Sequence, residues 1–145
     1  MNITPIDIVS GFIIAAIWIC GFSVISEPRR RQVNCILVGL AASTYGNHSF
    51  GLTEAAGTII LLTLGILGLG NYRWLGVAWL VHSGLDIAHH IANDPMFQYF
   101  PASSVGCAVT DPILALWFFA GAPDIFGIIK QQRSPSSFDT DSQEN

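Results

Sequence analysis

The feature that most limits the fold of this chain is a series of five apolar runs separated by short polar connectors. The runs cover residues 6–26, 33–46, 52–70, 74–91 and 105–122. A hydrocarbon core about 30 Å thick requires about 20 helical residues, so the first and fourth runs are long enough to span it and the second and third are marginal. Only 11% of the residues are charged, whereas soluble domains have about 25%. The sequence therefore predicts an all-α, polytopic membrane helix bundle with about five transmembrane helices.

The basic residues predict how this bundle is oriented. The chain has six of them: Arg29, Arg30, Arg31, Arg73, Lys130 and Arg133. With five spans, all of these fall in the first connector, the third connector and the C-terminal segment, which lie on one side of the membrane. The positive-inside rule then predicts an N-terminus outside, a cytosolic C-terminus and a multi-pass protein of the cell (plasma) membrane. A re-entrant hairpin formed by the second and third runs would leave three spans with the same orientation of the ends, and charge does not separate the two topologies.

The rest of the composition bounds the domain organisation. We expect one domain over residues 1–129, and a disordered cytosolic tail over residues 130–145, where apolar periodicity is absent. The three cysteines are far apart and have no CxxC spacing, so neither a disulfide framework nor a zinc ribbon is indicated. No basic patch supports nucleic-acid binding. The expected partner is the lipid bilayer.

The fourth run contains an unusual density of titratable side chains in WLVHSGLDIAHHIANDP, residues 79–95. His82, Asp86 and His89 follow i, i+4, i+7 spacing, which places them on one helix face. His90 lies one position off this face and is i+4 from Asp86. On the opposite face, Gly84 and Ala88 form a small-xxx-small pair that predicts close packing of another helix.

Other segments add titratable groups at the same depth. With the predicted topology they all fall in the outer half of the bilayer: His48, Glu54, His82, Asp86, His89, His90, Cys107 and Asp111. An ionisable group near the bilayer centre costs about 2.5–3.5 kcal/mol on insertion scales, and such groups generally mark a pathway or a site. We therefore expect an outward-facing pocket rather than isolated polar contacts between helices.

Imidazoles and carboxylates that converge from several helices are suited to zinc or another divalent metal. The predicted metal ligands are His82, Asp86, His89 and His90. Glu54 and Asp111 are then the candidate catalytic carboxylates, acting as general base or orienting a ligand. This set predicts a metal-dependent intramembrane hydrolase that acts on a lipid or another amphiphile. Two alternatives stay open: a proton or divalent-cation transport protein, whose path would require a homo-oligomer, and a structural protein whose polar residues hold helices together.

Two segments also carry a family resemblance. HSGLDIAHH and the following FPASSVGCAVTDPILALWFFAGAP are similar to a family of small multi-pass membrane proteins classed as domain-of-unknown-function family six-zero-one-zero. The residues that match its pattern are His82, Asp86, His89, His90, Pro101, Ser103, Ser104, Cys107, Asp111, Pro112 and Trp117. The SEPRRRQ segment and the acidic residue Glu54 are also similar. The resemblance covers most of residues 5–129 and implies the same multi-pass topology, but it implies no activity.

Overall fold

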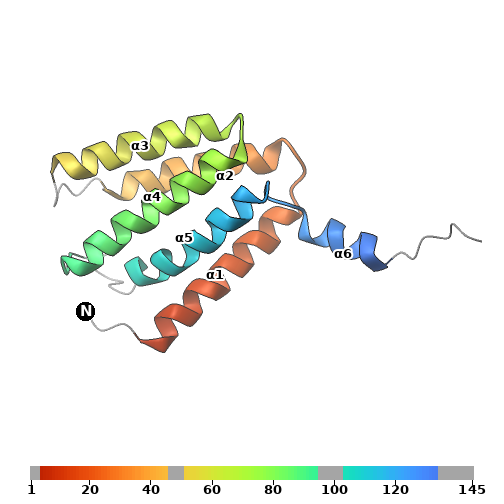
Figure 1. Ribbon diagram of the computed structural model, residues 1–145, viewed down its shortest axis with the longest axis horizontal. Helices are drawn as coiled ribbons and strands as arrows, with labels where there is room; N and C mark the ends of the chain where they lie inside the picture. Colours follow the sequence, from red (N-terminus) through yellow and green to blue (C-terminus); the bar gives the residue numbers. More distant parts are fainter. Residues whose placement is uncertain (1–3, 46–50, 95–102, 134–145) are drawn as a thin grey trace, which may run out of the picture.

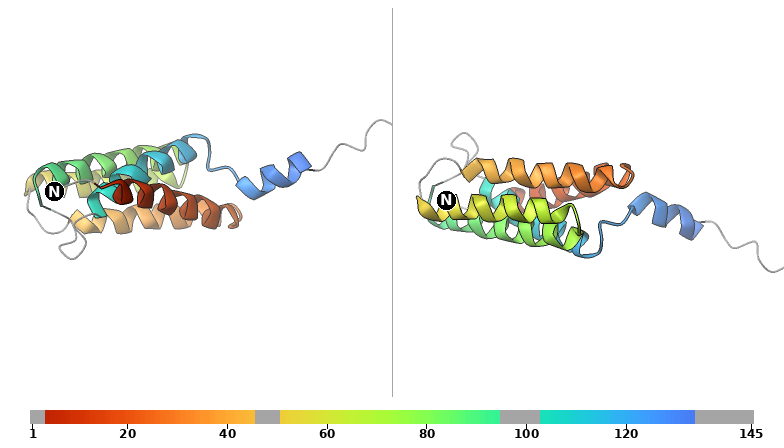
Figure 2. Two further views of the ribbon diagram at one scale, coloured as in Figure 1. Left: turned by 90° about the horizontal axis from the view of Figure 1, so that it is seen from below. Right: turned by 90° about the horizontal axis from the view of Figure 1, so that it is seen from above.

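In the computed structural model, residues 4–45, 51–94 and 103–133 are described, and the part of the chain in these ranges is entirely helical between its turns. The elements are α1 (Pro5–Ser23), α2 (Arg29–Ala42), a short 3-10 helix η1 (Ser43–Tyr45), α3 (Leu52–Gly68), α4 (Tyr72–Ile91), α5 (Ser103–Phe119) and α6 (Ile125–Arg133). The predicted all-α class is thus confirmed. Helices α1 to α5 lie along a common long axis, and α6 extends away from one end (Figures 1 and 2).

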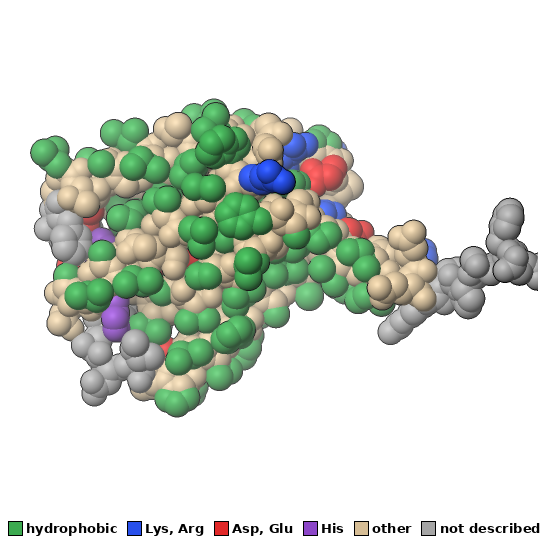
Figure 3. Space-filling view, in the orientation of Figure 1, with side chains coloured by type: hydrophobic (Ala, Val, Ile, Leu, Met, Phe, Trp, Pro, Cys, Tyr) green, Lys and Arg blue, Asp and Glu red, His purple; other side chains and the backbone are tan. Residues whose placement is uncertain are grey.

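Helix α4 lies at the centre of the packing. It contacts α5, α3 and α2, while α1 packs mainly against α5. Large apolar side chains fill the interior around it, and those with 0% exposure include Leu61, Leu75 and Phe118. Apolar side chains also cover much of the outer surface (Figure 3). Among the described residues, α1 is the one helix that is long and apolar enough to cross a membrane, and α3 and the segment Ser104–Phe119 are shorter apolar helices.

The arginine segment belongs to α2 rather than to the connector in which the sequence analysis placed it, and the reason is the role of Arg30. This side chain is only 7% exposed. Its guanidinium donates hydrogen bonds to the carbonyl oxygens of Ile25 at 2.8 Å, Ala122 at 2.7 Å and Ser23 at 3.3 Å. These carbonyls follow or end α1 and α5, where a helix leaves its last C=O groups without partners. Arg30 therefore joins the ends of three helices.

Two further expectations differ from the structure. A Cβ atom built on Gly84 meets nothing within 4 Å, and Ala88 is exposed, so the small-xxx-small face of α4 packs against no helix of this chain. The prediction of close packing on that face is wrong for the described residues, because α4 turns its polar face and not its small one towards the bundle. Helix α6 also runs to Arg133, beyond the predicted boundary at residue 130, and residues 134–145 lie outside the described part.

Candidate functional site

The polar face of α4 points into the bundle. His82, Asp86 and His89 are 4%, 0% and 4% exposed, as expected for one buried stripe at i, i+4, i+7 spacing. Asp111 of α5 and Glu54 of α3 are buried opposite this stripe, at 2% and 1% exposure. Three helices therefore deliver titratable side chains to one end of the bundle.

The deeper part of the site is a cluster of three residues, His82, Asp86 and Asp111, which we call the His82 cluster. The Nδ1 atom of His82 lies 2.8 Å from Oδ2 of Asp111 and 3.1 Å from Oδ2 of Asp86. The contact with Asp111 has hydrogen-bond geometry. The other ring nitrogen of His82, Nε2, is buried and has no hydrogen-bond partner among the described residues. One imidazole nitrogen thus faces two carboxylates at once.

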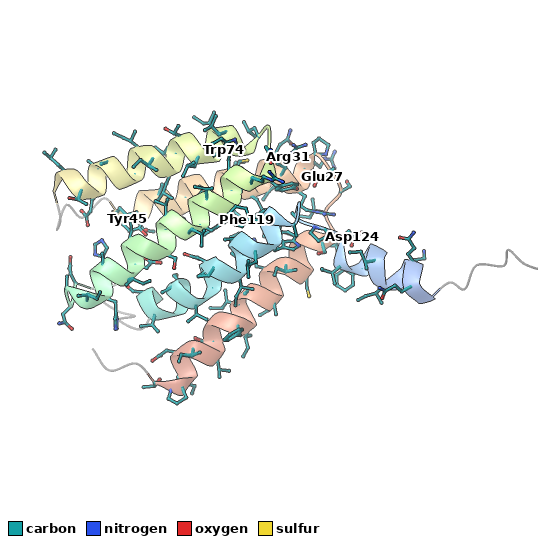
Figure 4. All side chains as sticks on the ribbon, in the orientation of Figure 1. Glu27, Arg31, Tyr45, Trp74, Phe119 and Asp124 are labelled. Carbon is teal, nitrogen blue, oxygen red and sulfur yellow. The ribbon has the colours of Figure 1, made fainter. Side chains whose placement is uncertain are left out.

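Tyr45 completes the surroundings of the His82 cluster. Its hydroxyl lies 3.2 Å from Oδ1 of Asp86 and 3.1 Å from the carbonyl oxygen of His82. Its ring packs against the rings of His82 and His89, with centroid distances of 5.3 and 5.7 Å. The residue belongs to η1, next to the polar end of α4 (Figure 4). Tyr45 is not among the site residues predicted from the sequence; its one signal there is its position at the end of the second apolar run, followed by polar residues.

Ser83 fixes the position of α5 beside α4. Because Pro112 has no N–H group, the carbonyl of Ala108 has no partner of its own in the helix. The Ser83 hydroxyl donates a hydrogen bond to that carbonyl at 3.3 Å. This contact lies on the turn that carries Asp111, so it helps to hold the Asp111 carboxylate against His82.

The outer part of the site is a second pair, Glu54 and His89, which we call the Glu54–His89 pair. Oε1 of Glu54 lies 3.2 Å from Nε2 of His89. On the other side of the imidazole, Nδ1 of His89 lies 3.0 Å from the carbonyl oxygen of Asp94. Glu54 is in the first turn of α3 and His89 in the last turn of α4. The helix dipoles favour an anion at the first position and a cation at the second.

The remaining predicted residues lie around these two groups. His90 is half-buried, and its Nδ1 atom is buried with no hydrogen-bond partner among the described residues. Cys107 is half-buried on α5. His48 and Pro101 lie outside the described residues. The ligand and catalytic roles assigned from the sequence stay predictions; the structure assembles Asp111 with His82 and Asp86, and His89 with Glu54.

The charges of the molecule are separated along its axis. On the face shown in Figure 3, histidine side chains lie at one end and lysine and arginine side chains towards the other, where Figure 4 places Glu27, Arg31 and Asp124. At the basic end, the Tyr72 hydroxyl donates to Glu27, and the Arg31 guanidinium lies 5.5 Å from the centroid of the Tyr72 ring. The buried carboxylates of the site therefore have no lysine or arginine beside them among the described residues.

The His82 cluster has the chemistry of a metal site. One ligand atom from each of its three residues lies within 4.8 Å of the others. Around a tetrahedral zinc ion with bonds of about 2.0 Å, ligand atoms are about 3.3 Å apart. The separations of 2.8 and 3.1 Å in the His82 cluster are close to that spacing, so a small outward movement of the ligands would accommodate an ion.

An apolar groove lies elsewhere on the bundle, between α2 and α3, with a volume of about 300 Å³. Its lining residues are Gln32, Cys35, Ile36, Gly39, Leu62, Gly65, Ile66 and Leu69. None of them belongs to the His82 cluster or the Glu54–His89 pair, so the groove is not part of the candidate site.

Comparison with known proteins identifies a matching family, but the function of that family is unknown. The model of a family of unknown function, DUF6010, matches residues 6–124. This range contains both polar groups of the site and the helices that carry them. No curated protein and no solved structure matches the chain.

Proposed function

The chain belongs to the DUF6010 family of unknown function, and we propose from its polar site that it is a membrane-embedded, divalent-metal-dependent hydrolase. The metal is held by His82, Asp86 and Asp111, and the substrate is a lipid or another amphiphile. This assignment differs from the set expected from the sequence, because Asp111 replaces His89 and His90 as a ligand.

The observation that carries the proposal is the imbalance of buried charge. Asp86 and Asp111 share one imidazole nitrogen, and no lysine or arginine lies near them among the described residues. A buried carboxylate without a compensating charge is strongly unfavourable. A divalent cation in place of the proton between these three side chains would neutralise both carboxylates.

The donor set also suits hydrolysis. One imidazole and two carboxylates are typical ligands of zinc and of other first-row divalent metals. Three protein ligands would leave a coordination position for water, and a bound divalent metal would supply the Lewis acidity that lowers the pKa of such a water towards neutral. Tyr45 would hold the Asp86 ligand through its hydroxyl, and Ser83 would hold the turn that carries Asp111.

Several features support placing the bundle across a membrane. Helix α1 is long and apolar enough to span it. Large apolar side chains are exposed along the other helices, among them Ile36 at 62%, Ile66 at 69% and Leu116 at 69%. The arginines lie at the end opposite to the histidines (Figure 3), as the positive-inside rule requires for a bundle with its polar site towards the outside.

Transport is the second candidate, favoured by the presence of two carboxylate–imidazole groups at successive depths along α4. Against it, the interior between the His82 cluster and the basic end is filled by apolar side chains such as Leu75, Leu114 and Phe118, each at most 1% exposed. A cation or proton path through one chain would have to cross this packed region. Hydrolysis requires access from one side alone.

Metal analysis of the detergent-purified protein tests the proposal. We expect the wild type to retain divalent metal and Asp86→Asn and Asp111→Asn, which remove charge with little change of shape, to lose it. Asp7→Asn serves as the matched control, because the Asp7 carboxylate accepts hydrogen bonds from Thr4 and lies outside the cluster. Metal-free wild-type protein that also fails to take up added zinc or manganese would exclude the metal centre.

The reaction is tested separately with the metal-loaded protein. Hydrolysis of ester- or amide-linked lipids that is lost in Asp86→Asn would support the hydrolase. Metal flux into liposomes, without hydrolysis, would instead support the transport alternative.

A further inference from the structure

The Glu54–His89 pair has an arrangement that hydrogen bonding between its members does not explain. The two side chains approach to 3.2 Å, but the contact does not have hydrogen-bond geometry, and both carboxylate oxygens of Glu54 are buried without a hydrogen-bond partner among the described residues. Glu54 is only 1% exposed. A carboxylate that is removed from water and has no donor is costly, so a positive charge beside it is favourable, carried either by a protonated His89, whose Nδ1 also lies 3.6 Å from Oδ2 of Asp94, or by a bound metal ion.

The proton on His89 is placed by Asp94. The carbonyl oxygen of Asp94 can only accept a hydrogen bond, so the 3.0 Å contact requires the proton to be on Nδ1. In neutral His89 the lone pair is then on Nε2 and is directed towards Glu54. A backbone carbonyl that orients a histidine in this way is the usual support of a histidine that binds a metal through its other nitrogen.

We propose that Glu54 and His89 bind a second divalent cation, at the outer end of the bundle. The ion would be held by Nε2 of His89 and by the Glu54 carboxylate. Its charge would offset the free-energy cost of burying that carboxylate without a hydrogen-bond donor. The 3.2 Å separation of the two ligand atoms matches the spacing of about 3.3 Å around a tetrahedral zinc ion. With two protein ligands, water or a substrate oxygen completes the coordination, so this ion binds more weakly than the one in the His82 cluster.

A purely structural role for Glu54, as an acidic residue at the start of α3, accounts for only part of this arrangement. Glu54 lies in the first turn of α3, where the helix dipole stabilises an acidic side chain by about 0.3–1 kcal/mol. An acidic residue with that role is normally exposed and solvated, whereas this carboxylate is buried and directed at an imidazole. The dipole therefore stabilises an acidic side chain at this position but supplies no hydrogen-bond donor to the Glu54 oxygens.

One side chain, Tyr45, contacts a histidine of each proposed cation position. The Tyr45 ring contacts the imidazoles of both His82 and His89, at 5.3 and 5.7 Å. Paired metal ions that act together on one reacting group lie about 3.5–4 Å apart, so two ions separated by the Tyr45 ring would be independent sites. The second site shares with the proposed function the premise that this end of the bundle binds divalent metal, but its ligands are different, and its test is separate.

The test is a titration of the full-length protein in detergent with zinc, after removal of metal by a chelator. We expect two ions per chain in the wild type, and loss of the weaker one in His89→Gln. The matched control is His90→Gln, the same change at the neighbouring, half-buried histidine, which should keep both ions. Glu54→Gln gives an independent variant that removes the charge and keeps the shape, and it should also lose the weaker ion.

Each result is decisive. A single ion in the wild type that is kept in His89→Gln, or two ions in both His89→Gln and Glu54→Gln, would overturn the second site. A single ion that is lost in Asp111→Asn and kept in His89→Gln would do so while leaving the proposed function intact. No zinc binding by the wild type would overturn both proposals. Loss of the weaker ion in His90→Gln but not in His89→Gln would show that His90 binds the second ion, and would reject the Glu54–His89 pair as its site.

Discussion

At the residue scale, the site depends on how a few buried polar atoms share partners. The hydroxyl of Tyr45 has a single proton, and two acceptors lie within reach of it, Oδ1 of Asp86 at 3.2 Å and the carbonyl of His82 at 3.1 Å. This side chain touches the proposed metal ligand Asp86 without being a ligand itself. Residues that orient metal ligands typically contribute a factor of about 10–100 to metal affinity.

We therefore expect Tyr45→Phe to weaken zinc binding in the His82 cluster by about 10–100-fold, because it removes the hydroxyl and keeps the ring. Tyr72→Phe is the matched control: its hydroxyl donates to Glu27 at the basic end, so its loss should leave zinc affinity unchanged. Competition with a chromophoric chelator measures both. Equal affinities for Tyr45→Phe and the wild type would show that the hydroxyl does not support the metal ligand.

At the element scale, the bundle is held by close approaches between helices, and α1 with α5 gives the clearest one. A Cβ atom on Gly11 would lie 2.7 Å from Cβ of Val109 and 2.9 Å from the carbonyl oxygen of Gly106. The Thr110 hydroxyl reaches the Gly11 carbonyl across the same contact, at 3.0 Å. Since two of these obstacles are backbone or Cβ atoms, α1 would have to move to accept a side chain at position 11.

Gly11→Ala should accordingly destabilise the protein by about 1–3 kcal/mol, the usual cost of overpacking. Gly84→Ala is the opposite case, because nothing lies within 4 Å of the added atom; alanine should stabilise α4 there by about 0.5–1 kcal/mol. The midpoint of denaturation by sodium dodecyl sulfate in mixed micelles measures both changes. A larger loss of stability in Gly84→Ala than in Gly11→Ala would show that a second chain packs on the face of α4 that carries Gly84 and Ala88.

At the scale of the whole molecule, the separation of charge along the axis predicts the orientation of the proposed membrane bundle. Leu52, at the start of α3, is 89% exposed near the histidine end, whereas Arg73 is exposed at the start of α4, at the basic end. These two residues mark opposite ends of the bundle on consecutive helices. For the proposed membrane-spanning bundle, the positive-inside rule predicts that Arg73 lies in the cytosol.

We expect a membrane-impermeant maleimide to label Leu52→Cys in intact cells, and Arg73→Cys only after permeabilisation. Labelling of the unmodified chain, which has three cysteines, gives the background. The reverse pattern would invert the orientation and place the polar site towards the cytosol. A Leu52→Cys variant that stays unlabelled in both states, with Arg73→Cys labelled after permeabilisation, would favour the re-entrant hairpin over five spans.

The sequence alone was sufficient for the features that depend on local periodicity. Apolar runs predicted four of the five long helices to within about three residues of their observed bounds and placed α2 four residues too late, and the i, i+4, i+7 spacing predicted that His82, Asp86 and His89 share the buried face of α4. The separation of the lysine and arginine residues from the histidines and carboxylates of the site also followed from their order along the chain. These properties involve neighbours within one helix, so the spacing of residue types determines them.

Only the tertiary structure decided which side chains meet. It brought Asp111 to His82, set Glu54 against His89, and placed Tyr45 between the two groups. It also buried Arg30 at the junction of three helices and left Gly84 facing outwards. These contacts depend on the rotation of each helix about its axis and on its height beside its neighbours. Both are fixed by the packing of side chains from distant segments, such as the approach of α1 to α5 at Gly11, and no periodicity within a single helix contains that information.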